Sequence, residues 1–173
     1  MGKVSKQVEN AIKEALRLEI NGREFYNHAA EITLSELGKK TFQRLAEEED
    51  AHLEAFGKLF SEVLTGEDWK KHIREEEIRS KAPLIERLKE STKKEKGQGE
   101  LEALRLGMEL ERNAIDHFQN AAEKADDPKA KEIFVRVGEQ ETLHYDLLQA
   151  QYDSVTKTGF WFDVAEFYMD GKY

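Results

Sequence analysis

The chain has 173 residues, a formal net charge of −9, no cysteine and only two prolines. This length suits one domain with a sizeable core, and the 36% of charged residues, interleaved with apolar ones, indicates long solvated helices. The acidic balance argues against nucleic acid or an anionic membrane surface as the partner, and the missing cysteines exclude disulfides and cysteine-ligated metals within these residues. With no apolar run of membrane-spanning length and no signal-like N-terminus, we expect a cytoplasmic protein.

Apolar periodicity predicts four long helices, at about 5–31, 35–64, 99–124 and 128–154. Ser5 is the expected N-cap of the first helix. The fourth begins with Asp127 as N-cap and Pro128 at the first helical position. The second helix shows most clearly a seam, meaning a line of core-facing positions, because its apolar residues are spaced by alternating steps of three and four.

The connections differ in length. Helices one and two are joined by a few residues, as are three and four, so each pair is predicted to be an antiparallel hairpin. Residues 65–98 form a charge-rich crossover with short helical pieces, and an aromatic tail at 155–173 folds back onto apolar surface. We therefore predict one all-α domain over residues 1–173, a bundle of two hairpins joined by a long crossover.

The second half of the chain repeats the first. A shift of 92 residues, which takes Glu19 to Glu111, aligns two segments without a gap. The identical pairs are Glu19/Glu111, Asn21/Asn113, Ala29/Ala121, Ala30/Ala122, Glu31/Glu123, Phe42/Phe134, Arg44/Arg136, Glu47/Glu139, Glu49/Glu141 and His52/His144. Each half is thus one hairpin of a duplicated bundle.

Each repeat carries a Glu followed 30 residues later by a Glu-x-x-His motif, whose two side chains share one helix face. These motifs occupy the apolar seams, which run Phe42, Leu45, Glu49, His52, Phe56, Leu59 and Phe134, Val137, Glu141, His144, Leu148. A buried carboxylate costs several kcal/mol unless a charge compensates it. Something in the core must therefore balance these side chains.

Four Glu and two His match two divalent cations, because four carboxylates balance four positive charges. Carboxylate and imidazole ligands suit iron or manganese. The predicted ligands are Glu19, Glu49, His52, Glu111, Glu141 and His144. The alternative is a decayed site that folds without metal.

Other polar residues are weaker candidates. Asp116 and Asp146 are candidates to orient the ligand histidines, although each is more simply a solvated helix residue. His28 and His117 lie away from the seams and are expected at the surface or rim.

Four motifs carry a family resemblance, namely LEINGREFYNHAAE, FQRLAEEEDAH, LERNAIDHFQNAAE and FVRVGEQETLH. They resemble the rubrerythrin-like branch of the ferritin-like superfamily over about residues 14–153. The resemblance implies a ferritin-like fold, two iron ions that react with hydrogen peroxide or dioxygen, and a homodimer. Tyr26 matches a family tyrosine beside the metals, either as a hydrogen-bond donor behind the ligands or as a core filler; its counterpart in the second half is Phe118.

Two departures from the family matter. Rubrerythrin itself adds a cysteine-ligated rubredoxin domain, and without cysteine this chain must take electrons from a separate donor such as a rubredoxin. Rubrerythrin also has an extra Glu one turn after the third-helix ligand, where this sequence has Ala114 and, in the first half, Gly22. A six-ligand centre is therefore expected, and the iron-shifting peroxide mechanism of rubrerythrin does not carry over.

The expected function is a di-iron oxidoreductase that reduces peroxide or dioxygen, with Glu49 and Glu141 bridging the two ions. Two alternatives remain. One is a ferroxidase or iron-storage role, and the other is a structural or regulatory bundle in which metal serves folding only.

Overall fold

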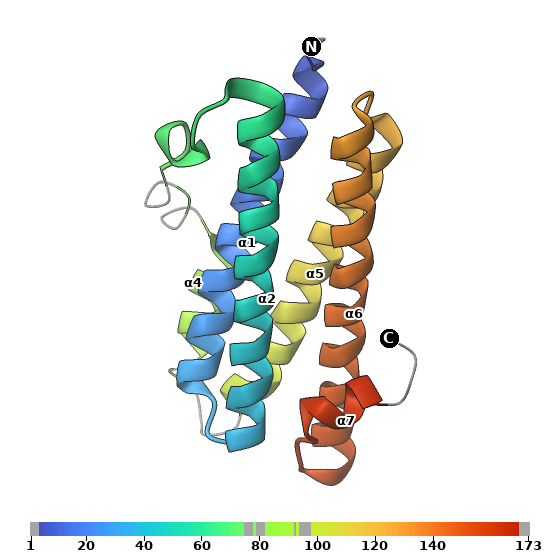
Figure 1. Cartoon of the computed structure of the whole chain (residues 1–173). Coiled ribbons are helices and arrows are strands. Elements are labelled where there is room, and N and C mark those ends of the chain that lie inside the picture. Colours follow the sequence, from blue (N-terminus) through green and yellow to red (C-terminus); the bar gives the residue numbers. More distant parts are fainter. Residues whose placement is uncertain (1–3, 75–77, 79–81, 92, 94–97, 170–173) are drawn as a thin grey trace.

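The structure is a computed structural model that describes residues 4–74, 78, 82–91, 93 and 98–169. Within these residues it is helical and contains no strand, and four long helices form a bundle (Figure 1). They are α1 (Lys6–Ile32), α2 (Glu36–Phe60), α5 (Gln98–Lys124) and α6 (Pro128–Thr158). Helices α1 and α2 form one antiparallel hairpin and α5 and α6 the other, so the predicted fold class is confirmed.

Ser5 and Asp127 cap the starts of α1 and α6 as predicted, and Ser35 caps the start of α2. The side chains of Ser5, Ser35 and Asp127 each accept a hydrogen bond from the backbone N–H three residues later. Pro128 stands at the first helical position, where its missing N–H costs nothing. Helix α6 runs to Thr158 rather than ending near Ser154, and stops where Gly159 adopts a left-handed backbone with φ of 80°.

The crossover is partly helical, as predicted. Helix α2 ends in a π-helical turn (Ser61–Thr65), which is followed by a 3-10 turn (Trp69–Lys71) and by α4 (Pro83–Ser91). Helix α4 lies along α1 and α5. The rest of the predicted crossover, at 75–77, 79–81, 92 and 94–97, lies outside the described residues, as do 170–173 of the predicted tail.

The aromatic tail folds back onto the bundle through Trp161 and the short helix α7 (Val164–Met169). The Trp161 ring packs edge-on against Phe42, with centroids 5.7 Å apart. It lies so close to α2 that a Cβ on Gly38 would come within 2.8 Å of it. Glu100 ties this end of the bundle together, since it accepts hydrogen bonds from Trp161 Nε1 and from the backbone N–H groups of Leu34 and Ser35.

The apolar core falls into two separate clusters. One surrounds Phe56, Phe118 and Phe134, and the other surrounds Phe42 and Trp161. Between them lies a layer of buried polar side chains contributed by all four long helices. The fold thus brings a set of charged groups to the middle of a closely packed bundle. Among the described residues, no helix is both long enough and apolar enough to cross a membrane.

Candidate metal centre

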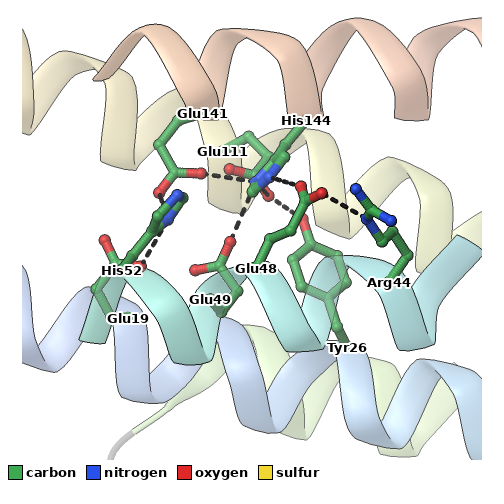
Figure 2. A network of polar contacts seen from close by, with 9 residues as sticks. All are labelled: Glu19, Tyr26, Arg44, Glu48, Glu49, His52, Glu111, Glu141 and His144. Carbon is green, nitrogen blue, oxygen red and sulfur yellow. Dashed lines mark hydrogen bonds and ion pairs between the residues drawn. The ribbon is translucent and has the colours of Figure 1, made fainter. Parts of the chain in front are cut away.

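The polar layer consists of the six residues predicted from the repeat. Corresponding helices of the two hairpins contribute the same residue types: α1 and α5 each contribute one Glu, and α2 and α6 each contribute one Glu and one His. All are buried, with at most 5% of the residue exposed: Glu19 on α1, Glu49 and His52 on α2, Glu111 on α5, and Glu141 and His144 on α6. Figure 2 shows the six side chains converging from the four helices. The structure therefore brings together every residue predicted as a ligand.

The six side chains form two overlapping groups with the spacing of metal ligands. One group is Glu19, Glu49, His52 and Glu141, and the other is Glu49, Glu111, Glu141 and His144. Within each group the ligand atoms lie within 4.8 Å of one another. Glu49 and Glu141 belong to both groups, which is the arrangement of two carboxylates shared between neighbouring cations.

Both histidines turn their Nδ1 atoms toward the carboxylates. Nδ1 of His52 lies 3.1 Å from Glu141 and 3.3 Å from Glu19. Nδ1 of His144 lies 2.8 Å from Glu141 and 3.2 Å from Glu49. The two rings are nearly parallel, with centroids 5.5 Å apart. Each half thus presents one imidazole nitrogen to the shared carboxylates.

Burial makes the charges of this layer interdependent. Burial and the nearby charges of Glu49 and Glu141 raise the pKa of Glu19 well above its usual value. Burial, with the charges of Glu141 and Glu49, likewise raises the pKa of Glu111. Without a cation, these two carboxyl groups therefore favour the protonated, neutral form.

The histidines shift in the direction that adds positive charge. Burial would lower the pKa of His52, but its polar contacts with Glu141 and Glu19 raise that pKa to about 11. Burial is likewise outweighed at His144, whose pKa is raised by the charge of Glu141. Although burial opposes it, His144 holds the pKa of Glu141 well below its usual range. The carboxylates thus demand cations, and protons on imidazole supply part of the compensation.

Several ligand atoms have no hydrogen bond of acceptable geometry in the described part of the chain. They are both carboxylate oxygens of Glu19, one oxygen each of Glu49, Glu111 and Glu141, and Nδ1 of His144. Buried polar atoms in folded proteins are nearly always paired. Buried oxygen and nitrogen atoms that converge with their hydrogen bonds incomplete are suited to metal ions, so this donor set fits two divalent cations.

A second layer of polar side chains holds the ligands in place. The Tyr26 hydroxyl on α1 donates a hydrogen bond to Oε1 of Glu111. Nε2 of His144 donates to Oε2 of Glu48 at 2.6 Å, and Nε of Arg44 donates to the other oxygen of Glu48 at 2.6 Å (Figure 2). Tyr26 is thus both a buried ring and a hydrogen-bond donor, and the two interpretations left open for it hold together.

The partner of His144 differs from the ones that the sequence suggested. Asp116 is exposed on α5, and Asp146 is half-buried on α6, whereas Glu48 supplies the carboxylate that contacts His144. The sequence signal for Glu48 was indirect, because it lies four residues after Arg44, a spacing that supports an ion pair on one helix face. His28 and His117 are half-buried on α1 and α5, away from this layer.

The position of the absent extra carboxylate is filled by packing. Ala114 is buried in the first apolar cluster. Its counterpart Gly22 lies beneath Glu49, where an added Cβ would come 2.6 Å from Oε2 of that residue. The described site therefore has six candidate ligands, four carboxylates and two imidazoles.

A four-helix bundle with two Glu-x-x-His motifs and two further Glu facing its core defines a ferritin-like carboxylate protein. The family model for rubrerythrin matches residues 10–152, and the chain belongs to the rubrerythrin family. Members of this family typically bind iron. Among curated proteins, no significant match was found.

Solved structures confirm the fold. A hypothetical protein from Methanococcus jannaschii aligns with a TM-score of 0.69 at 16% identity, covering 98% of this chain and 94% of its own. A hypothetical protein from Pyrococcus furiosus aligns with a TM-score of 0.66 at 24% identity, covering 86% and 90%. A two-domain protein from Anabaena variabilis, with DJ-1/ThiJ/PfpI-like and ferritin-like domains, aligns with a TM-score of 0.66 at 16% identity. That alignment covers 90% of this chain but only 39% of the Anabaena chain.

Proposed function

We propose that this protein is a di-iron oxidoreductase that reduces hydrogen peroxide or dioxygen with electrons from a separate donor. The observation that carries the proposal is the cluster of six buried ligand side chains, whose unpaired oxygen and nitrogen atoms converge in two overlapping groups. Manganese is the alternative metal, since the same hard oxygen and imidazole ligands suit it.

Each ligand has a role that its position supports. Glu49 and Glu141 belong to both groups and would bridge the two ions. Glu19 with His52, and Glu111 with His144, would each complete one ion's shell. Two iron ions held by these residues would supply two-electron redox chemistry, the number of electrons needed to take hydrogen peroxide to water or dioxygen to peroxide, and an external donor such as a rubredoxin would provide the electrons.

A hollow in the surface next to the centre offers a route for a small substrate. A surface hollow of about 530 Å³ lies between α2 and α6, and both ligand histidines contribute to its wall together with Glu48. The apolar clusters above and below exclude water from the layer itself. Glu48 carries a carboxylate at the junction of hollow and centre, where it can accept the proton on Nε2 of His144.

The proposal is tested by loading metal-free protein with Fe(II) under anaerobic conditions and adding peroxide or dioxygen. We expect two Fe(II) per chain, oxidised in proportion to the oxidant consumed, and repeated turnover when a chemical reductant is present. Glu49→Ala removes a shared carboxylate and should abolish two-metal loading while helix content stays near normal. Glu47→Ala, at the exposed neighbouring position, is the matched control.

Two results would contradict the proposal. Iron accumulating well beyond two per chain in a large assembly would favour iron storage. Tight metal binding without consumption of either oxidant would favour a structural role for the metal.

A further inference from the structure

Among the differences between the two halves of the duplicated centre, two place a polar group against a candidate ligand in one half only. The repeat pairs Tyr26 with Phe118, and Glu48 with Gln140. Both polar members of these pairs, Tyr26 and Glu48, lie in the first half of the chain. Because each half reaches across to the other hairpin, both act on ligands of the second half.

The first difference concerns the terminal carboxylates. Tyr26 donates its hydroxyl hydrogen bond to Glu111 across the bundle. Its counterpart Phe118 is fully buried, stacks on Phe56 with centroids 5.3 Å apart, and has no group to donate. Glu19, the counterpart of Glu111, has neither carboxylate oxygen hydrogen-bonded within the described residues. Glu111 thus has a hydrogen-bond donor from outside the ligand set, whereas the contact of Glu19 is with His52, itself a candidate ligand.

The second difference concerns the histidines. Nε2 of His144 donates to the carboxylate of Glu48, which Arg44 holds from the other side. The corresponding residues near His52 are Gln140 and Arg136, which line the hollow together with that histidine. The polar contacts of His52 are made through Nδ1, with Glu141 and Glu19. Both histidines line the hollow, but His144 has an anionic partner in Glu48, whereas the corresponding residue on the side of His52, Gln140, is a neutral amide.

Such outer partners affect how tightly a metal is held. A carboxylate behind a ligating imidazole fixes the ring orientation and raises the basicity of the ligating nitrogen. A hydrogen bond to a ligating carboxylate fixes its rotamer before the metal arrives. Removing one such partner typically lowers metal affinity about 10- to 100-fold. Both partners here serve the same half of the centre, so their effects add on one ion.

We propose that the two metal subsites are unequal and fill in a fixed order. The subsite of Glu111 and His144 binds the first ion tightly, and the subsite of Glu19 and His52 binds the second ion more weakly and exchanges it through the hollow between α2 and α6. This inference rests on the proposed two-metal function and adds which ion is retained and which is labile. The differing residues Tyr26, Phe118, Glu48 and Gln140 set the order.

The test is a titration of the metal-free protein with Co(II), in which calorimetry and equilibrium dialysis measure the binding. We expect two binding steps separated by about tenfold or more in affinity. A crystal grown with one equivalent of Co(II) should show anomalous scattering concentrated beside Glu111 and His144. Equal occupancy of the two positions would overturn the proposed order.

Variants assign the cause. Glu48→Gln should weaken the first step about 10- to 100-fold and leave the second nearly unchanged, so that the two steps merge. Gln140→Glu should strengthen the second step, because the new carboxylate stands toward His52 as Glu48 stands toward His144. Glu47→Gln, an exposed neighbour of Glu48, is the control and should change neither step.

Glu48 and Gln140 both lie at the wall of the hollow. Circular dichroism verifies that each variant is folded. Two steps that Glu48→Gln leaves unchanged would overturn the assigned cause. Failure of the protein to bind Co(II) at all would overturn the two-metal function as well. Two equal, tight ions would overturn only the order, so the two failures are distinguishable.

Discussion

The Cβ position of Gly22 on α1 lies 2.6 Å from Oε2 of Glu49 on α2. Glu49 belongs to both ligand groups, so its carboxylate crosses α1 at a place where that helix has no side chain. Real Cβ atoms do not approach an oxygen so closely. The glycine is therefore part of the centre, although it offers no ligand.

Gly22→Ala should displace the Glu49 carboxylate and weaken binding of both ions, by about tenfold or more, because productive ligand geometry tolerates shifts of only about 0.5 Å. The metal-free protein should lose little stability, since Ala favours a helix by about 1 kcal/mol over Gly. Co(II) titration and thermal unfolding measure the two effects. Gly99→Ala is the matched control, because the nearest atom to its added Cβ lies 3.9 Å away.

Tyr26→Phe should lower the free energy of unfolding of the metal-free protein by about 1–2 kcal/mol, because it leaves a buried oxygen of Glu111 without its donor. Chemical denaturation at constant pH measures the change. Tyr145→Phe removes a hydroxyl that accepts a surface hydrogen bond from Arg112, and should cost much less. Equal losses in the two variants would show that Tyr26 contributes only as an apolar ring.

The aromatic tail provides a prediction that is independent of metal. Trp161→Ala should destabilise the protein by about 3–5 kcal/mol, the usual cost of emptying a buried aromatic site. Binding of two metal ions per chain should persist, because Trp161 packs against Phe42 and donates a hydrogen bond to Glu100, and neither is a candidate ligand. Thermal unfolding and metal analysis measure both. Loss of metal binding with an intact fold would show that the tail acts on the centre directly.

The sequence was sufficient to predict which polar residues meet in the core, because duplication and apolar seams gave two independent patterns that coincide. Burying a Glu at an apolar seam position costs desolvation free energy. The repeat places a Glu at the corresponding seam position in both halves. Glu48 could not be found this way, since it is off the seam, half-buried and adjacent to a ligand. Its contact with His144 depends on the relative rotation and distance of α2 and α6. The sequence pattern of a single helix does not determine that arrangement.

The end of α6 illustrates another limit. Val155, Thr156 and Thr158 are β-branched and therefore weak helix formers, so the periodic pattern stops near Ser154. The helix continues for another turn, and Val155 packs there against the second apolar cluster. The left-handed conformation of Gly159 then ends it. Tertiary packing outweighs helix propensity over that turn.

Metal removal should lower the stability of the protein. A ligand at about 100 times its dissociation constant stabilises the folded state by about 2.7 kcal/mol. For a chain of this size, that corresponds to a rise in Tm of about 5–10 °C. Thermal unfolding before and after chelation, with readdition of Co(II) as the control for reversibility, measures it. An unchanged Tm after verified removal of the metal would contradict a core whose carboxylates need cations.

The pH dependence of the metal-free protein follows from the raised pKa values in the polar layer. Folding raises the pKa of His52 to about 11 and also raises the pKa of His144, Glu19 and Glu111. Unfolded carboxyl groups titrate near about 4.3 and imidazoles near about 6.5. From about pH 5 to pH 9 the folded state therefore holds more protons than the unfolded chain, and its stability falls as the pH rises. Glu141, with its lowered pKa, acts in the opposite sense only in acid.

Metal binding should reverse this trend, because the cations replace those protons and their affinity rises as the protons leave. The Tm difference between Co(II)-loaded and metal-free protein should therefore widen from about pH 6 to about pH 8.5. Thermal unfolding of both forms across this range measures it. Replacing His52 by Gln removes one of the retained protons, so it should flatten the metal-free profile. A metal-free protein that gains stability toward alkaline pH would show that the carboxylates of the layer are compensated by something other than protons.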